Sequence, residues 1–212
     1  MAMPSLPSGP ELTAILAVVC FSAGLNVYAT VGMLGLLARA GMLTLPPSLH
    51  GLESWYVIGA CSALFLLEFV GDKIPVFDLL WNATHTFVRV PVAAFLAYAA
   101  TSQLPPWEQS LATLAGAILA LAAHGGKTAA RAMVAPSPEP FSNAALSLSE
   151  DALVVFLMWL LTKHPYAAAG IAMACVAFIL VMARWVVESL RNLLRDAEQV
   201  VSGTHPGQSP NP

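Results

Sequence analysis

Ionisable side chains are concentrated in two stretches of this chain, although only 10% of its residues are Asp, Glu, Lys or Arg. The first stretch holds Glu68, Asp72, Lys73, Asp78, His85 and Arg89. The second stretch holds His124, Lys127 and Arg131. Carboxylates can carry a proton or a cation, basic groups can neutralise them or hold an anion, and imidazole can relay protons near neutral pH. The sequence therefore predicts one polar site of mixed charge.

The spacing within these stretches places the polar residues on helix faces. Residues three or four positions apart lie on one side of an α-helix. The first such face consists of Asp78, Asn82, His85 and Arg89. For this face two interpretations are equally open: it lines a cavity inside the protein, or it is the cytoplasmic face of a helix at the membrane interface. The second face, with His124, Lys127 and Arg131, holds an anion or neutralises nearby acids.

Glu68 and Asp72 are also four positions apart. Two carboxylates on one helix face repel each other unless a proton, a cation or a basic side chain lies between them. We interpret Glu68, the deeper of the two, as a proton or cation site. For Asp72, ion pairing with a base, Lys73, Arg89 or Arg131, is the favoured interpretation.

The segment before the fifth apolar run carries two further acids, Glu150 and Asp151. Ser147 with Glu150 fits a capping box that would open a helix near Ser149. Because successive residues point to different sides of a helix, one acid can cap while the other reaches the polar site. Helix breaks and polar support are expected at four further residues: Asn26, Asn82, Glu139 and Asn143.

Composition predicts an integral membrane protein. Of the 212 residues, 58% are hydrophobic, and the mean hydropathy is +0.72, whereas soluble domains are about 45–50% apolar and about 25% charged. A net charge of -3 and the lack of a basic patch with interleaved aromatics disfavour nucleic-acid binding. Cys20, Cys61 and Cys175 each lie within an apolar stretch, so we expect them to pack rather than to form disulfides.

Because a span needs about 20 mostly apolar residues, the sequence predicts an all-α, polytopic membrane protein of about six transmembrane or re-entrant helices. Their approximate ranges are 11–41, 55–71, 76–101, 107–134, 149–162 and 167–194. The first is too long for one straight span and should break at Gly24-Leu25-Asn26. The third should be interrupted at Pro91, which makes it either a full span or an interfacial helix followed by a re-entrant piece.

We expect a single transmembrane domain at residues 11–196, between a short cytoplasmic N-terminus (1–10) and a disordered polar tail (197–212). The positive-inside rule places both termini in the cytoplasm, since most loop bases fall on one side and Lys163 on the other. An Ala-Arg-Ala sequence followed by a proline-rich connector recurs in residues 35–54 and 127–147. This recurrence suggests a 3+3 inverted repeat with halves 11–103 and 106–196, an arrangement found in secondary transporters.

Two stretches, EFVGDKIPVFDLLWNATHTFVRVP (68–91) and HGGKTAARAMVAPSPEPFSNAALSLSEDALV (124–154), resemble an uncharacterised bacterial inner-membrane family, domain of unknown function 4126. The resemblance covers roughly residues 12–190. It implies a multi-pass protein of the bacterial inner membrane and no particular activity. Glu68-Phe-Val-Gly-Asp72-Lys73 is also similar to the Glu-x-Gly-Asp-Lys-Thr motif of a manganese and calcium transporter family. This chain departs from that motif by one extra residue after the Glu and by Ile74 in place of the Thr.

The leading hypothesis is a small secondary transporter or ion-coupled permease, with its site between the second, third and fourth helices. The alternatives are a protein that binds or translocates lipid or lipid phosphate, and a membrane scaffold whose charges fix helix packing. We expect no enzyme and no cofactor, because no nucleophile or cofactor motif accompanies the acids; whether a metal binds is left open. The expected partners are the lipid bilayer, a small ion or solute, anionic lipid and, from Gly32 and Gly35, further copies of the chain in a homo-oligomer.

Overall fold

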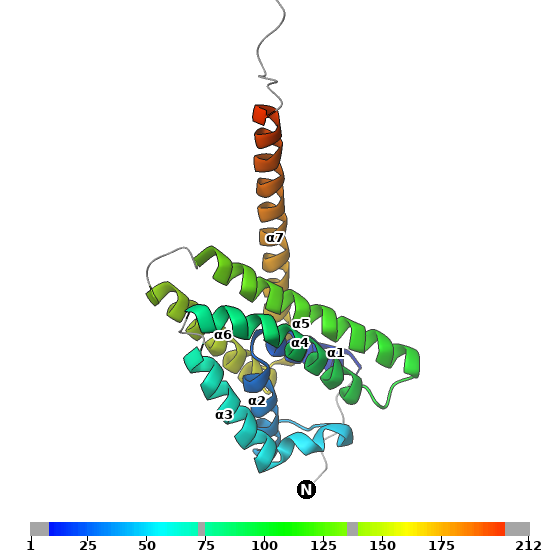
Figure 1. Ribbon diagram of the computed structural model, residues 1–212. Coiled ribbons are helices and arrows are strands. Elements are labelled where there is room, and N and C mark those ends of the chain that lie inside the picture. The colour runs from blue at the N-terminus through cyan, green and yellow to red at the C-terminus, as the bar shows by residue number, and fades with distance from the viewer. Residues whose placement is uncertain (1–8, 72–74, 135–139, 202–212) are drawn as a thin grey trace, which may run out of the picture.

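The computed structural model of the protein describes residues 9–71, 75–134 and 140–201, and the regular secondary structure of this part of the chain is entirely helical, without a strand. The elements are α1 Gly9–Leu25, α2 Val27–Arg39, the 3₁₀ helix η1 Pro47–Glu53, α3 Trp55–Gly71, α4 Pro75–Ala100, α5 Pro106–Val134, α6 Pro140–Leu161 and α7 Pro165–Val201. Figure 1 shows their arrangement. The predicted all-α fold is confirmed.

Proline is the first residue of four α-helices: Pro75 in α4, Pro106 in α5, Pro140 in α6 and Pro165 in α7. Proline suits this position because the N–H that it lacks has no acceptor within the first turn of a helix. The predicted start of the fifth helix near Ser149 is therefore wrong, since α6 already begins at Pro140. Ser147 lies inside α6 and is fully buried, so it does not form the predicted capping box with Glu150.

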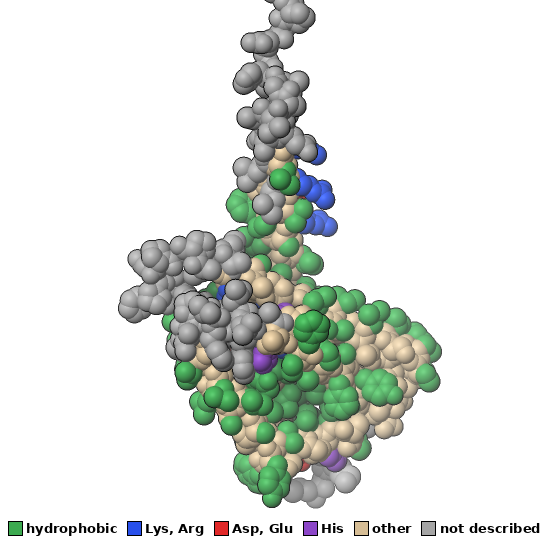
Figure 2. All heavy atoms as spheres, in the orientation of Figure 1, with side chains coloured by type: hydrophobic (Ala, Val, Ile, Leu, Met, Phe, Trp, Pro, Cys, Tyr) green, Lys and Arg blue, Asp and Glu red, His purple; other side chains and the backbone are tan. Residues whose placement is uncertain are grey.

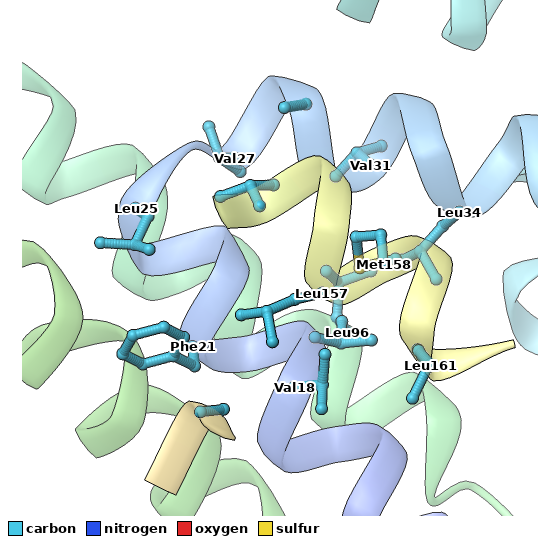
Figure 3. Close-up of a cluster of buried hydrophobic side chains, with 14 of the residues drawn as sticks. Val18, Phe21, Leu25, Val27, Val31, Leu34, Leu96, Leu157, Met158 and Leu161 are labelled. Atoms are coloured by element: carbon cyan, nitrogen blue, oxygen red, sulfur yellow. The ribbon is translucent and has the colours of Figure 1, made fainter. Parts of the chain in front are cut away.

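The helix α1 forms the centre of the bundle. It packs against α4, α5, α6 and α7, and every residue from Val18 to Leu25 is buried. The main hydrophobic core gathers around this segment and includes Leu34 of α2, Leu96 of α4 and Leu157 of α6 (Figure 3). α4 and α5 run side by side across this centre (Figure 1), so the inward-facing polar residues of both helices are held close to α1.

The chain breaks between α1 and α2, as the sequence predicts. α1 ends at Leu25, Asn26 has extended backbone angles (φ -147°, ψ 103°), and α2 begins at Val27. The helix axis changes direction at this point (Figure 3). The first predicted helix is therefore two shorter apolar helices of 17 and 13 residues.

The predicted interruption at Pro91 is wrong, because α4 runs from Pro75 to Ala100 as one helix of 26 residues with Pro91 inside it. A proline removes one hydrogen bond of the helix and crowds the preceding turn, but packing on both sides can keep the helix intact. Arg89 precedes the proline and Ala93 and Leu96 follow it, and all three are buried. Packing against neighbouring helices thus outweighs the local effect of the proline.

By length and hydropathy, two segments of the described chain are suited to cross a membrane: Ala144–Leu161 of α6 and Pro165–Ser189 of α7. A third results if η1 and α3, which are bent by 63° relative to each other, form one broken span. α1 and α2 are apolar but shorter. The predicted total of about six spans is therefore supported for these two or three segments and stays a prediction for the others.

Apolar side chains also lie on the outside of the bundle (Figure 2). On α5 they form a stripe at helical spacing, with more than half of each side chain exposed: Leu111, Leu114, Ile118 and Leu121. α7 projects from the bundle (Figure 1) and exposes Phe178 and Trp185. Water-soluble proteins rarely expose so much continuous apolar surface. These apolar helices are those of a membrane-embedded protein.

Gly32 and Gly35, which we expected to support contacts between copies of the chain, are used for packing within it. A Cβ at Gly35 would lie 2.3 Å from the backbone oxygen of Leu52, and one at Gly32 would lie 3.4 Å from Cys61 Cβ. The two glycines allow α2 to approach η1 and α3 closely. The homo-oligomer stays a prediction, but these residues no longer support it.

Gly24 allows α1 to approach α5, and this contact can be tested. A Cβ at Gly24 would lie 2.4 Å from the backbone oxygen of Ala120 and 2.8 Å from Ala123 Cβ. We expect Gly24→Ala to lower the free energy of unfolding by about 1–3 kcal/mol, because the helices must separate. The control Gly59→Ala in α3, where nothing lies within 4 Å of the new Cβ, should be neutral or stabilising. Thermal unfolding in detergent compares the two variants, and equal midpoints would contradict the close α1–α5 contact.

Candidate functional site

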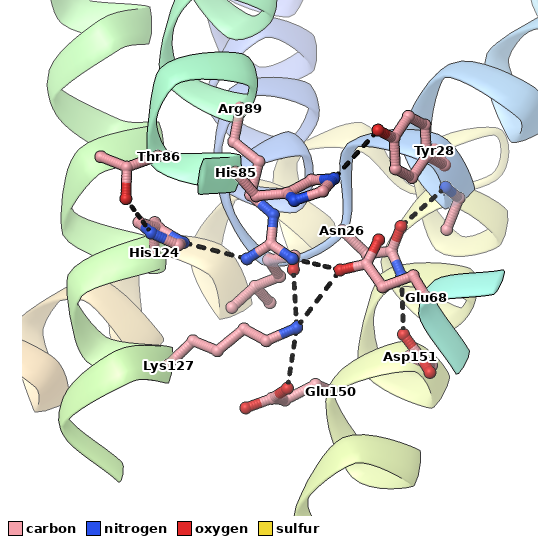
Figure 4. Close-up of polar contacts among 12 residues, drawn as sticks. Asn26, Tyr28, Glu68, His85, Thr86, Arg89, His124, Lys127, Glu150 and Asp151 are labelled. Carbon is pink, nitrogen blue, oxygen red and sulfur yellow. Dashed lines mark hydrogen bonds and ion pairs between the residues drawn. The ribbon is translucent and has the colours of Figure 1, made fainter. Parts of the chain in front are cut away.

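Ionisable side chains from four helices meet beside the break between α1 and α2 (Figure 4). They are Glu68 of α3, His85 and Arg89 of α4, His124, Lys127 and Arg131 of α5, and Glu150 and Asp151 of α6. Each of these eight residues is at most 8% exposed. We refer to these eight side chains and Asn26 as the buried polar cluster. Charges in such surroundings are tolerated only when they are paired and hydrogen-bonded.

Lys127 is the centre of the buried polar cluster. Its Nζ lies 3.6 Å from Glu68 Oε1 and 3.2 Å from Glu150 Oε2. It also donates a 3.3 Å hydrogen bond to the backbone oxygen of Leu25, the last residue of α1. One ammonium group therefore connects α5 to α1, α3 and α6.

Each of the two carboxylates also has an arginine of its own. Arg89 pairs with Glu68 Oε1, and Arg131 Nη2 donates to Glu150 Oε2 at 2.9 Å. Among the charged side chains of the buried polar cluster, three are acidic (Glu68, Glu150 and Asp151) and three are basic (Arg89, Lys127 and Arg131), so their formal charges cancel. The cancellation lowers the cost of holding these groups inside an apolar bundle.

Asn26 organises the helix break. In a continuous helix the N–H of Ala29 would donate to the backbone oxygen of Leu25. Here it donates instead to Asn26 Oδ1 at 2.9 Å, as expected for a helix N-cap. The oxygen of Leu25 is thereby left for Lys127. Asn26 Nδ2 donates to Asp151 Oδ1 at 2.9 Å, which fixes the side chain of the cap.

The charges near this break match the two helix ends. The C-terminal end of a helix carries partial negative charge, and the N-terminal end carries partial positive charge. The cationic Lys127 contacts the last carbonyl of α1, while the anionic Asp151 binds the residue that caps α2. Electrostatics and hydrogen bonding therefore favour the same broken backbone.

Two histidines extend the buried polar cluster. Arg89 Nη1 lies 2.9 Å from His124 Nδ1; because a guanidinium can only donate, Nδ1 accepts. In a neutral imidazole, Nε2 then carries the proton and donates to Thr86 Oγ1, 2.7 Å away. On the other side, the Tyr28 hydroxyl lies 2.9 Å from His85 Nε2. Tyr28 and Thr86 were not among the predicted site residues; the helical spacing of Thr86 from Arg89 could have indicated it, whereas no pattern marks Tyr28.

The structure brings together nine of the predicted site residues, which form the buried polar cluster. Three others lie in helices, Asp78 and Asn82 in α4 and Asn143 in α6, but their side chains are outside the described part of the structure. Asp72, Lys73 and Glu139 lie outside the described residues altogether. The site described here therefore does not include these six side chains.

The orientation of α4 distinguishes between the two interpretations of its polar face, which were a lining inside the protein and the cytoplasmic face of an interfacial helix. His85 is 5% exposed and Arg89 is fully buried, whereas Phe87 on another side of the helix is 81% exposed. A helix at the interface with its polar face in water would have the opposite pattern. At these positions α4 therefore turns its polar side into the protein and its apolar side outward.

Glu68 is the most enclosed acid of the buried polar cluster, with no exposed surface. Its Oε1 forms ion pairs with both Arg89 and Lys127, while its Oε2 accepts no hydrogen bond from any described group. A buried acceptor without a donor costs about 1–3 kcal/mol. Among the described residues, no group of three or more His, Cys, Asp or Glu side chains is arranged to hold a metal ion.

The contact between Asn26 and Asp151 can be tested by exchanging the two side chains. Asn26→Asp keeps an acceptor for Ala29 but places two carboxylates together, so it should lower the free energy of unfolding by about 1–3 kcal/mol. Asn26→Asp with Asp151→Asn restores an amide and a carboxylate, and should recover stability. Unfolding midpoints of the four proteins in this cycle should reveal a coupling of at least about 1 kcal/mol. Additive effects would contradict the contact.

Comparison with known proteins places the chain in a family. Residues 13–185 match the family model described as a domain of unknown function, DUF4126. No curated protein and no solved structure matches the chain. The match covers most of the chain and nearly the same residues as the resemblance noted in its sequence. The protein is therefore a member of the DUF4126 family.

Proposed function

We propose that this membrane protein is a small secondary transporter or ion-coupled permease that uses the buried polar cluster as its binding site. The observation that carries the proposal is the position of Lys127, whose ammonium lies between carboxylates of two helices and the open end of a third. Charged groups inside membrane proteins are costly and commonly mark ion or substrate pathways.

The sharing of Lys127 favours a site that changes state over a static scaffold. Glu68 and Glu150 are on α3 and α6, and Lys127 is within ion-pair distance of both. When one carboxylate gains a proton or a cation, its attraction for the ammonium weakens and the other carboxylate holds it more strongly. Two such arrangements would bias the packing of different helices, which is what coupling between binding and conformation requires.

The broken helix adds independent support. In many secondary transporters, discontinuous helices expose backbone carbonyls and helix ends to the substrate or coupling ion near the middle of the membrane. In this protein the break at Asn26 is fully buried and directly adjoins the charged side chains. The inverted repeat suggested by the sequence would be consistent with such a transporter and remains part of the proposal.

Within this proposal the acids bind the coupling proton or cation, with Glu68 as the principal group. His85 relays protons, and the basic side chains balance the acids. Lipid phosphate is a less suitable ligand, because Arg89, Lys127 and Arg131 already contact carboxylates that a phosphate would have to displace. We further propose a location in the bacterial inner membrane with both termini in the cytoplasm, and no catalytic activity.

Ion flux through proteoliposomes tests the proposed function. Uptake of radioactive sodium, calcium and manganese is measured, and proton flux is followed with entrapped pyranine, under an imposed pH or potassium gradient. We expect at least one of these ions to move faster than in protein-free liposomes. Glu68→Gln should lower that rate by at least about tenfold, which corresponds to an activation free energy higher by about 1.4 kcal/mol, because the carboxylate that binds the ion is lost.

The matched control is Glu188→Gln, which removes an exposed carboxylate on α7 and should transport like the wild type. If none of the four ions moves above background, the proposal of an ion-coupled permease is wrong. If Glu68→Gln transports as fast as the control, the buried polar cluster is not the pathway, and a role in helix packing becomes the better explanation.

A further inference from the structure

We propose that Lys127 Nζ occupies a binding site for a monovalent metal cation, and that sodium takes this place when the lysine leaves it. The site consists of Glu68 Oε1, Glu150 Oε2 and the backbone oxygen of Leu25, each within 3.6 Å of the ammonium. This proposal goes beyond the general transport function, because it identifies the site of a specific ligand. It also identifies sodium as the coupling ion that the transport function would use.

The ligand atoms are those that a hard cation prefers. Alkali and alkaline-earth ions bind carboxylate and carbonyl oxygens, and all three neighbours of Lys127 named above are of these kinds. They come from three separate helices, α1, α3 and α6, and Figure 4 shows the ammonium between Glu68 and Glu150. The site is enclosed: Glu68 has no exposed surface, and Lys127 is 3% exposed.

The backbone oxygen in this site is available for a specific reason. The cap made by Asn26 takes the N–H of Ala29 away from Leu25, and the free carbonyl then points out of the end of α1. Carbonyls at the C-terminal end of a broken helix are established sodium ligands in transporters. Asp151 accepts a hydrogen bond from Asn26 and holds it in this conformation. The contact between Asn26 and Asp151 therefore helps to keep the Leu25 oxygen available to a cation.

A second independent feature points to a cation. Glu68 Oε2 is buried and accepts no hydrogen bond from a described group. An ammonium donates along fixed N–H directions, whereas a metal ion has no directional requirement and can bind both oxygens of a carboxylate. A sodium ion in place of the ammonium would therefore satisfy an oxygen that Lys127 and Arg89 leave without a donor.

The total charge of the site favours a monovalent ion over a divalent one. Exchange of the singly charged ammonium for sodium leaves the total charge of the site unchanged, whatever other groups surround it. Exchange for calcium would add one uncompensated positive charge in a region that also contains Arg89 and Arg131, and buried unpaired charge is strongly unfavourable. Lys127 and sodium should therefore compete for the same oxygens. The role of sodium as coupling ion rests on the proposed transport function. The existence of the sodium site does not rest on it.

The test is the thermal stability of purified Lys127→Ala in detergent, with sodium chloride replacing choline chloride at constant ionic strength. A ligand that binds the folded state raises the unfolding midpoint by mass action. We expect sodium to raise the midpoint of Lys127→Ala by about 4 °C or more and that of the wild type by much less, because Lys127 competes for the same oxygens in the wild type. Lys163→Ala, which removes an exposed lysine after α6, should respond like the wild type.

Three further results decide the assignment. Lys127→Ala/Glu68→Gln should lose the sodium response; if the response persists, sodium binds elsewhere and the proposal fails. Calcium should stabilise Lys127→Ala less than sodium, and a larger effect of calcium would overturn the monovalent assignment. If Lys127→Ala folds and shows no response specific to sodium, the site does not exist.

Should Lys127→Ala not fold in choline, Lys127→Gln is purified in parallel in choline and in sodium. A higher yield of folded, monodisperse protein in sodium supports the site, and an equal yield, including none in both, overturns it. These measurements use no membrane and no gradient. Sodium binding without ion flux would therefore contradict the proposed transport function alone, and flux without sodium binding would contradict the cation site alone.

Discussion

The need to neutralise Lys127 inside an apolar bundle is the constraint on which the rest of this structure depends. The ammonium holds together the end of α1, the last turns of α3 and the middle of α6. Removing one partner of a buried ion pair typically costs about 3–5 kcal/mol, because the other charge stays behind unpaired. The helix break, the positions of Glu68 and Glu150, and the two additional arginines are therefore one connected arrangement rather than separate features.

The polar part of this arrangement could be predicted from sequence to the extent that it follows helical spacing. Residues 85 and 89, and residues 124, 127 and 131, share helix faces, as their spacing predicts. That the face with residues 85 and 89 turns inward could not be decided from sequence, because a cytoplasmic face of an interfacial helix was equally open. Which acid meets which base could not be predicted, because Asn26 and Asp151 are 125 positions apart and no local pattern links them. The same is true of Leu25, whose contribution is a backbone oxygen that every residue type possesses.

The errors in the predicted helices have a common cause. Pro91 and Ser147 both have strong local preferences, one for a break and one for a helix start, yet both lie inside helices. Arg89 and Ala93, two residues before and after Pro91, are buried, and so is Ser147 itself. Packing determines the outcome where it opposes local propensity. The break at Asn26 was predictable because local preference and tertiary contacts agree there: the side chain caps α2 and is itself bound by Asp151.

The balance of charge in the buried polar cluster also bears on how the protein could change conformation. Two carboxylates each bind an arginine firmly, and a single lysine is divided between them. The arginines carry a charge that does not titrate in proteins and pair best in a fixed planar geometry, whereas lysine is a compact charge on a flexible chain. The less constrained cation is therefore the one at the helix break. Movement of Lys127 would alter contacts to α1, α3 and α6 at once, while the arginine pairs keep the acids in place for the ion that replaces it.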